Sequence, residues 1–323
     1  MQGERLREPK RARMAAGLST PSSGIEDDAL FALTLERLAN HWATRGVVEK
    51  TREPGYDMPF AHRICRMMLE KVGGDLAAYG AAVDDFIALS EEFVVLQMEL
   101  DRTGKYKYSS YEEVRAIVYD NPELMNRRYL NGLLLSETFW TNHYKMFRYF
   151  VDDFCGGNPA HGSVLEVPAG TGIFVSEFAR RNPGWRAHAI DISDSSVAFS
   201  RAVAQLNGDA RVDVRKRDVF DIPDDEKYDR LICGELLEHL ERPEELLAKL
   251  ARLSAPGARL FVTTAVWAAN IDHIYLYSSA QEVRDQLAGY FTLESELVLN
   301  VREGRGPEEP RTPINYACIL SPR

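Results

Sequence analysis

A glycine-rich turn and three acidic residues form the first candidate binding site in this sequence of 323 residues. The turn runs from Glu166 to Gly172, where Gly170 and Gly172 let the backbone approach a ligand closely. It lies between an apolar run and an amphipathic segment, so a helix N-terminus with free N–H groups should follow it. Asp191 stands 19 residues after Gly172, and Asp218 follows the next apolar run. Carboxylates at such positions suit a ligand that offers hydroxyl or amino donors.

The charges around this turn indicate which ligand it would hold. No basic residue lies at the turn, and Val175 stands where a dinucleotide-binding fingerprint needs its third glycine. Asp191 would accept from a ribose diol, Asp218 from the adenine amino group, and the Val219 N–H would reach a ring nitrogen. Because Glu166 is also available for an ammonium group, S-adenosylmethionine fits these residues better than a polyphosphate.

Two glutamates and a histidine after the fourth predicted strand form the second candidate site. Glu235, Glu238 and His239 stand at i, i+3 and i+4, which places them on one face of a helical turn. One interpretation is an acid-rich helix N-terminus with an exposed histidine, favoured by the helix dipole. The other is a metal site, because carboxylates and imidazoles together can bind a divalent cation. The residues alone leave both interpretations open.

Residues 160–323 resemble a class I S-adenosylmethionine-dependent methyltransferase. The family's glycine-rich first motif corresponds to the segment from Glu166 to Gly172, its ribose-binding acid to Asp191 and its adenine-contacting acid to Asp218. Pro168 departs from the family, which usually has glycine there. The resemblance implies S-adenosylmethionine as the cofactor, bound at Glu166, Pro168, Ala169, Gly170, Gly172, Asp191, Ile192, Asp218, Val219, Gly234 and Glu235.

The Glu-x-x-Glu-His segment resembles two branches of this family, the small-RNA 2′-O-methyltransferases and the ubiquinone-pathway O-methyltransferases. Both branches carry a divalent metal there, and the RNA branch adds a histidine after the fifth strand, which His273 matches. The implied metal ligands are Glu235, Glu238, His239 and His273. Two imidazoles among them suit Mn²⁺, Fe²⁺ or Zn²⁺ better than Mg²⁺. The metal would lower the pKa of an acceptor oxygen; without it, the candidate catalytic bases are His143, His239 and His273.

Two sequence patterns divide the chain near residue 155, and its length, at roughly 150 residues per domain, also predicts about two domains. After residue 155, short β-rich runs alternate with amphipathic segments. This alternation predicts an α/β, Rossmann-like fold of seven strands, parallel except for an antiparallel C-terminal hairpin. The predicted strands are 163–167, 186–191, 211–216, 228–233, 258–265, 291–299 and 314–320, and the helices are 171–181, 194–206, 242–254 and 280–288.

The first half shows helical periodicity and predicts an all-helical domain over 25–150, followed by a cofactor-binding domain over 151–323. Ser22 or Ser23 would cap a first helix that runs through Ala43. The other predicted helices are 60–72, 75–99, 111–119 and 122–152. Aromatic residues in the last one either form core or line a lid over the acceptor. The lid interpretation assigns substrate contacts to Tyr129, Phe139, Trp140 and Tyr144.

Composition and charge argue against several classes of protein. Lysine and arginine number 39 against 49 aspartates and glutamates, a net charge of −10, which disfavours nucleic acid or anionic membrane as the partner. Four widely spaced cysteines without a Cys-x-x-Cys pair favour a reduced, cytoplasmic protein. No apolar run approaches the roughly 18 residues of a membrane span. Residues 1–24 are predicted to form a flexible tail.

These observations predict a methyltransferase that modifies an oxygen of a small organic molecule with metal assistance. Helical extensions on such a core recur among methyltransferases of specialised-metabolite pathways, which is an analogy at the level of the fold. Three alternatives stay open: metal-independent N- or C-methylation with a histidine base, 2′-O-methylation of RNA, and a protein that binds the cofactor without transferring methyl. A homo-oligomer is compatible with the sequence.

Overall fold

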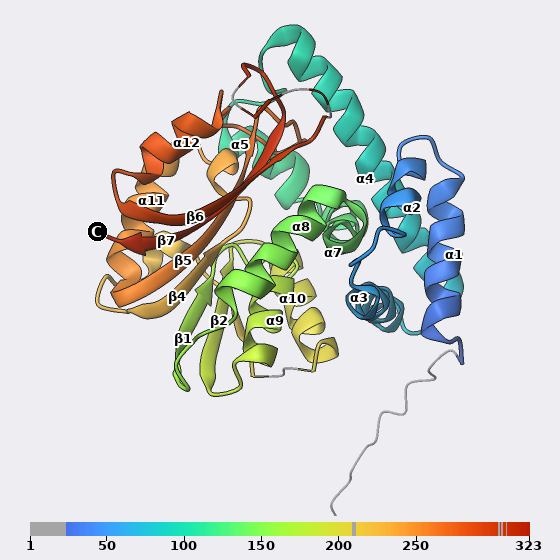
Figure 1. Cartoon of the computed structure of the whole chain (residues 1–323), viewed down its shortest axis with the longest axis horizontal. Coiled ribbons are helices and arrows are strands. Elements are labelled where there is room, and N and C mark those ends of the chain that lie inside the picture. Colours follow the sequence, from blue (N-terminus) through green and yellow to red (C-terminus); the bar gives the residue numbers. More distant parts are fainter. Residues whose placement is uncertain (1–23, 209–210, 303, 305, 308) are drawn as a thin grey trace, which may run out of the picture.

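A seven-stranded sheet with a bundle of helices beside it makes up the chain (Figure 1). The computed structural model describes residues 24–323 except 209–210, 303, 305 and 308, so the predicted tail and the capping serines Ser22 and Ser23 lie outside the described residues. The strand order is β3-β2-β1-β4-β5-β7-β6. The strands are β1 Gly162–Glu166, β2 Trp185–Asp191, β3 Asp213–Lys216, β4 Tyr228–Cys233, β5 Ser254–Val266, β6 Phe291–Asn300 and β7 Ile314–Pro322.

The direction of the strands confirms the predicted fold class. Strands β1 to β5 pair in parallel, while β7 pairs antiparallel with both β5 and β6. The hairpin is inserted so that β7 lies inside the sheet and β6 forms its edge. The strand order reverses at β1, between β2 and β4, so the loops that follow β1 and β4 diverge and leave a crevice at the carboxyl ends of the strands.

Both faces of the sheet are covered because successive strand residues point to opposite sides. Ile232 of β4 joins the apolar cluster that includes α9 and α10, whereas Leu231 and Cys233 join the cluster that includes α11 and α12. These four helices span α9 Ile173–Arg181, α10 Asp194–Leu206, α11 Pro243–Leu253 and α12 Ala280–Leu287. The central strands β1 and β4 are therefore buried on two sides, which explains their continuous apolar runs, whereas the edge strand β6 is largely exposed.

Residues 27–154, which we call the helical part, precede the sheet. Its helices are α1 Asp27–Ala39, α2 Arg45–Lys50, α3 Met58–Lys71, α4 Leu76–Thr103, α5 Tyr111–Val114, α6 Pro122–Leu124, α7 Leu130–Phe139 and α8 Thr141–Tyr149. Three π-helical turns span Arg115–Tyr119, Met125–Tyr129 and Phe150–Phe154. The first helix ends at Ala39 and not at the predicted Ala43, because a turn and the separate helix α2 follow it.

Trp140 interrupts the single helix that was expected over 122–152. Its backbone is extended, with φ −80° and ψ 120°, so α7 ends and α8 begins on either side of it. The indole Nε1 donates to Ser90 Oγ at 2.9 Å, and the ring packs against Phe86 and Phe93 of α4. The sequence period does not indicate this break because the apolar pattern continues through both helices.

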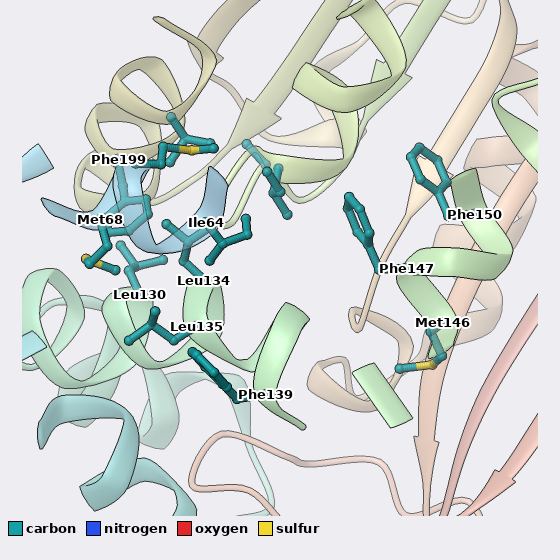
Figure 2. Packing of buried hydrophobic residues seen from close by; sticks show 14 of the residues in the cluster. Ile64, Met68, Leu130, Leu134, Leu135, Phe139, Met146, Phe147, Phe150 and Phe199 are labelled. Carbon is teal, nitrogen blue, oxygen red and sulfur yellow. The ribbon is translucent and has the colours of Figure 1, made fainter. Parts of the chain in front are cut away.

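One apolar cluster joins the helical part to the sheet. Figure 2 shows side chains of α3, α7 and α10 within it, among them Met68, Leu130 and Phe199. Farther along, Phe150 meets Phe174 of α9 edge to face, with ring centroids 5.0 Å apart. Many aromatic residues of the helical part therefore form core, and this core fixes the helical part against the sheet.

Two further features bear on where the protein works. No helix among the described residues is long and apolar enough to cross a membrane. All four cysteines are free and buried, so none of them pairs in a disulfide.

A buried ion network also ties the helical part to α9. The Glu177 carboxylate, with 0% of its side chain exposed, contacts Arg180 at 2.6 Å and Arg181 at 2.7 Å on its own helix, and Arg63 of α3 at 3.1 Å. Burial alone would raise the pKa of Glu177, but the three guanidinium groups lower it to about 2. The carboxylate is therefore charged at neutral pH and holds two elements together.

The Glu177→Gln variant should lower the free energy of unfolding at about pH 7 by about 3 kcal/mol, because a neutral amide leaves three guanidinium groups without their anion. Since the folded pKa lies below the ordinary value of 4.5, this stabilisation is present above that value and is lost as the pH falls toward about 2. Urea unfolding followed by circular dichroism at neutral and acidic pH measures both effects. Glu70→Gln, at an exposed position of α3, is the control. If both variants lost the same free energy of unfolding, the role of the ion network would be contradicted.

Candidate active site

Hydrogen bonds and close contacts with neighbouring residues fix the backbone conformation of the turn after β1. Gly170 and Gly172 have φ values of 49° and 73°, and a Cβ on Gly172 would lie 2.8 Å from the Cβ of Ser200. The Asp191 carboxylate accepts from the backbone N–H groups of Gly170 at 3.0 Å and Ser193 at 2.9 Å. Ser200 Oγ donates to the Gly170 carbonyl at 2.9 Å. The turn is thus tied to β2 and to α10, and its shape requires glycine.

Two adjoining cavities open at the carboxyl ends of the strands. The larger, of about 690 Å³, lies over β2 and β3 and includes Asp191, Asp218 and Val219 in its wall. The smaller, of about 220 Å³, lies over β1, β4 and β5 beneath the helical part. The residues that line both cavities mark their junction: Tyr111, Tyr119, Pro168, Asp191, Ile192, Leu236 and Leu240. A ligand that fills one cavity can therefore continue into the other.

The structure gathers nearly all the expected cofactor residues around these cavities. The residues that line one or both are Glu166, Pro168, Ala169, Gly170, Asp191, Ile192, Asp218, Val219, Gly234 and Glu235. Gly172 does not line either cavity, and its role is the close approach to α10 described above. Asp218 also accepts from the Phe220 N–H at 2.9 Å, which caps the short turn after β3.

The smaller cavity is acidic and has no basic counterpart. Its wall includes the carboxylates of Glu137, Glu166, Asp191 and Glu235, and no lysine or arginine is found among the described residues that line it. Burial raises the pKa of each of these four carboxyl groups. Such a cavity favours a ligand that brings positive charge with it.

Glu238, His239 and His273 form a buried cluster at one side of this cavity. One ligand atom from each lies within 4.8 Å of the others. His239 Nδ1 lies 3.0 Å from the Asp272 carbonyl oxygen, and His273 Nδ1 lies 2.8 Å from the Ala268 carbonyl oxygen. Because carbonyl oxygens only accept, both protons are on Nδ1, and both Nε2 lone pairs are free for a ligand. Burial lowers the pKa of His273 to about 3, so this ring is neutral.

The Glu238 carboxylate is oriented by two donors. Thr264 Oγ1 donates to it at 2.6 Å and the Ala265 N–H at 3.2 Å, while the Glu238 carbonyl accepts from the N–H groups of Ile274 and Tyr275. These bonds join the segment after β4 to the loop that carries His273. Burial, followed by the nearby Glu235, raises the pKa of Glu238 well above its ordinary value. A cation between the carboxylates of Glu235 and Glu238 would reduce their mutual repulsion.

Glu235 is not part of that cluster. Only Leu237–His239 forms a short 3₁₀ turn, and Glu235 precedes it with a φ of 46°, so the expected helical face shared by all three residues does not form. Glu235 instead lines the cavity, and its Oε1 is buried without a hydrogen-bond partner among the described residues. A positive φ at a residue other than glycine costs energy and often marks a functional position.

Asp272 links the helical part to the histidine cluster. Tyr119 donates to its Oδ2 at 3.0 Å and Tyr129 donates to the same atom, while its carbonyl accepts from His239. Each tyrosine ends a π-helical turn, a local widening that is frequent at functional sites. Asp272 thus joins two tyrosines of the helical part to His239.

His143 also faces the smaller cavity. Ser136 Oγ donates to the Leu133 carbonyl at 2.7 Å, so it accepts from His143 Nδ1 at 2.9 Å and leaves Nε2 free. Burial lowers the pKa of His143 to about 4. The ring is therefore a neutral hydrogen-bond acceptor and a weak base.

The four residues expected to contact the substrate divide into two pairs. Tyr129 and Trp140 line the smaller cavity. Phe139 packs against Phe31 and Phe86 in the core, and Tyr144 accepts from the Asp57 N–H at 2.8 Å and lines a separate surface hollow. The structure does not bring this second pair to the cavity. Sequence reasoning also missed several lining residues: Phe93, Tyr111, Tyr119, Leu133, Glu137 and Asn315.

Comparison with known proteins finds similarity for the central part of the chain. Residues 165–260 match a family described as a methyltransferase domain. An uncharacterized protein of a Synechococcus strain is 30% identical over 158 residues, which are 47% of this chain and 35% of that protein. The ubiquinone biosynthesis O-methyltransferase of Xanthomonas axonopodis pv. citri is 32% identical over 108 residues, which are 33% of this chain and 44% of the relative. The chain thus spans less than half the length of these curated relatives.

Among solved structures, a putative methyltransferase from Bacillus halodurans aligns with a TM-score of 0.44 and 16% identity. The alignment covers 56% of this chain and 98% of that chain.

The link between Tyr129 and Asp272 can be tested through stability. Asp272 is fully buried and its Oδ1 has no partner among the described residues, so the two tyrosine hydroxyls on Oδ2 are its principal donors. Tyr129→Phe should lower the free energy of unfolding by about 2 kcal/mol, because a buried acceptor loses one of its two principal donors. Chemical denaturation measures the change. Tyr290→Phe should be neutral, because the Tyr290 hydroxyl has no hydrogen-bond partner among the described residues. A neutral result for Tyr129→Phe as well would contradict the link.

Proposed function

We propose that this chain, whose residues 165–260 match a methyltransferase domain, is a class I S-adenosylmethionine-dependent methyltransferase. It would methylate an oxygen of a small organic molecule with the help of a divalent metal. The observation that supports it most is the pair of adjoining cavities at the strand ends. One is lined by the acids expected at the ribose and adenine, and the other by carboxylates and imidazoles. The sulfonium of the cofactor would then lie near their junction.

The reaction is an in-line displacement at the cofactor's methyl carbon. A bond forms between the acceptor oxygen and the methyl carbon while the carbon–sulfur bond breaks, and its electron pair neutralises the sulfonium. The acceptor hydroxyl must lose its proton before or during this step. The helical part contributes Tyr129 and Trp140 to the wall of the smaller cavity, and such a cover would protect the nucleophile from solvation.

Neither His143 nor His273 is suited to take that proton from an ordinary hydroxyl. Their pKa values of about 4 and about 3 make their conjugate acids far stronger than an alcohol or a phenol. This weakness supports activation of the acceptor by a metal. It also counts against a metal-independent enzyme that relies on either of these two histidines as base.

The residues of the Glu238 cluster fit a divalent metal. Glu238, His239 and His273 would hold it, since the two rings present unprotonated Nε2 atoms and the carboxylate is oriented by two donors. Glu235, beside the cluster, is the fourth candidate ligand. A metal bound there acts as a Lewis acid that lowers the pKa of an acceptor hydroxyl. The imidazoles favour Mn²⁺, Fe²⁺ or Zn²⁺ over Mg²⁺.

The wall of the smaller cavity supports a small, uncharged or cationic acceptor. It is largely apolar and aromatic, with Phe93, Tyr129 and Trp140 among its residues, and its volume of about 220 Å³ is small. Without lysine or arginine among the described lining residues, it offers nothing to a phosphate backbone. This composition favours a small organic acceptor, such as those of specialised metabolism, over RNA.

The cofactor assignment predicts that Asp191→Ala weakens S-adenosylmethionine binding by about 100-fold. The change removes the acceptor for the ribose diol and frees the turn that Asp191 holds at Gly170, and hydrogen bonds to a charged group are worth about 1.5–3 kcal/mol each. Isothermal titration calorimetry measures the affinity, and circular dichroism checks that the variant is folded. Asp225→Ala, at an exposed position, serves as the control. Unchanged binding by Asp191→Ala, or no binding by the wild type, would refute the assignment.

The metal assignment predicts about one bound divalent ion per chain when the protein is purified without chelator. His239→Ala should lose it, and the exposed His161→Ala should keep it; elemental analysis gives the content. With catechol as a probe acceptor, mass spectrometry should find a product heavier by one CH₂, lost with EDTA and restored by Mn²⁺. Methylation that survives EDTA in metal-free protein would favour the metal-independent alternative. Cofactor binding without any methylated product would favour the alternative in which the protein binds the cofactor but does not transfer its methyl group.

A further inference from the structure

Glu137 is an acidic side chain without a partner in the wall of the smaller cavity. It lies on α7, in a stretch of apolar residues, and reaches the cavity together with Leu133 and Trp140. No hydrogen bond or ion pair joins its carboxylate to another described residue. The Glu137 side chain is partly buried, and a carboxylate in such surroundings is costly unless a ligand compensates it.

The neighbours of Glu137 are other carboxylates. Its charge interacts with that of Glu166, at the end of β1, and with that of Glu235, just after β4. Strands β1 and β4 are adjacent in the sheet, so these three acids surround one region of the cavity from two strand ends and from the helical part. Glu235 Oε1 is itself buried without a hydrogen-bond partner. Carboxylates from different elements therefore face one region of the cavity without a lysine or arginine among the described lining residues, and such a region suits a cationic group.

The orientation of the cofactor indicates which cation that is, and this step rests on the proposed function. The acids for ribose and adenine line the larger cavity, so the amino-acid end of S-adenosylmethionine extends away from it, past Gly170, into the smaller one. That end carries a primary ammonium group. We propose that Glu137 pairs with this ammonium, together with Glu166, so that the helical part itself binds the cofactor.

The proposal gives the helical part a second role. A lid that only covered the acceptor could open without affecting the bound cofactor. If α7 contributes a counter-ion, the cofactor holds α7 in place, and the acceptor cavity is complete only once the cofactor is bound. Tyr111 and Tyr119, which line both cavities, extend this contact along the cofactor toward the adenosine.

The test compares two ligands that differ by the amino-acid end. S-Adenosylhomocysteine carries the ammonium, whereas 5′-methylthioadenosine has the same adenosine and thioether without it. By isothermal titration calorimetry, Glu137→Gln should bind S-adenosylhomocysteine at least about tenfold more weakly than the wild type, because a charged hydrogen bond is lost. It should bind 5′-methylthioadenosine equally well. Glu123→Gln, at an exposed position of α6, should change neither affinity.

The stability of the ligand-free protein separates this role from a structural one. Because Glu137 makes no ion pair among the described residues, Glu137→Gln should leave the melting temperature of the ligand-free protein unchanged or raised. The increase in melting temperature on adding S-adenosylhomocysteine should become smaller. Equal affinities of variant and wild type for S-adenosylhomocysteine would overturn the proposal. A similar loss of affinity for both ligands, together with a lower melting temperature, would also overturn the proposal, because it would show that Glu137 has a structural role. A wild type that binds neither ligand would refute the proposed function itself.

Discussion

Negative charge without a protein counter-charge is the constraint that shapes the strand ends of this molecule. Glu137, Glu166, Asp191 and Glu235 reach one small cavity from four different parts of the fold, and no described lysine or arginine lines it. Burial raises the pKa of each, so the folded chain alone leaves these groups poorly compensated. A cofactor that carries a sulfonium and an ammonium, or a divalent metal at the neighbouring cluster, supplies what is missing. The site is thus organised for cationic ligands before any ligand arrives.

The fold brings these acids together because two independent features position them. The parallel sheet places Glu166, Asp191 and Glu235 at the ends of adjacent strands, and the reversal of strand order opens space between them. The helical part adds Glu137 from the other side, and it is fastened to the sheet by the shared aromatic core and by the buried Glu177 network. Tyr119 and Tyr129 complete this attachment at Asp272. The position of Glu137 in the cavity wall therefore depends on packing between residues that lie far from the cavity.

The sheet and the glycine-rich turn could be predicted from the sequence because both depend on local patterns. Alternating apolar runs predicted all seven strands, and the spacing of Gly170, Gly172 and Asp191 predicted the turn. Helical periodicity could not separate Trp140, which lines the cavity, from Phe139, which is core, because both surroundings are apolar. Likewise, the i, i+3, i+4 spacing could not reveal the positive φ of Glu235. The one signal overlooked was Glu137, the only charged residue between 130 and 140.

The positions of the acids also bear on the rate of the proposed reaction. Methyl transfer from a sulfonium to an ionised oxygen neutralises charge, so a carboxylate beside the sulfur would stabilise the reactants more than the transition state and slow the step. Carboxylates at the ammonium do not carry this cost, because the ammonium keeps its charge throughout. In the proposed complex, Glu137 and Glu166 bind the cofactor by its unreactive end, while the wall near the sulfur is mainly apolar. Binding strength and reactivity are thereby assigned to separate parts of the same cavity.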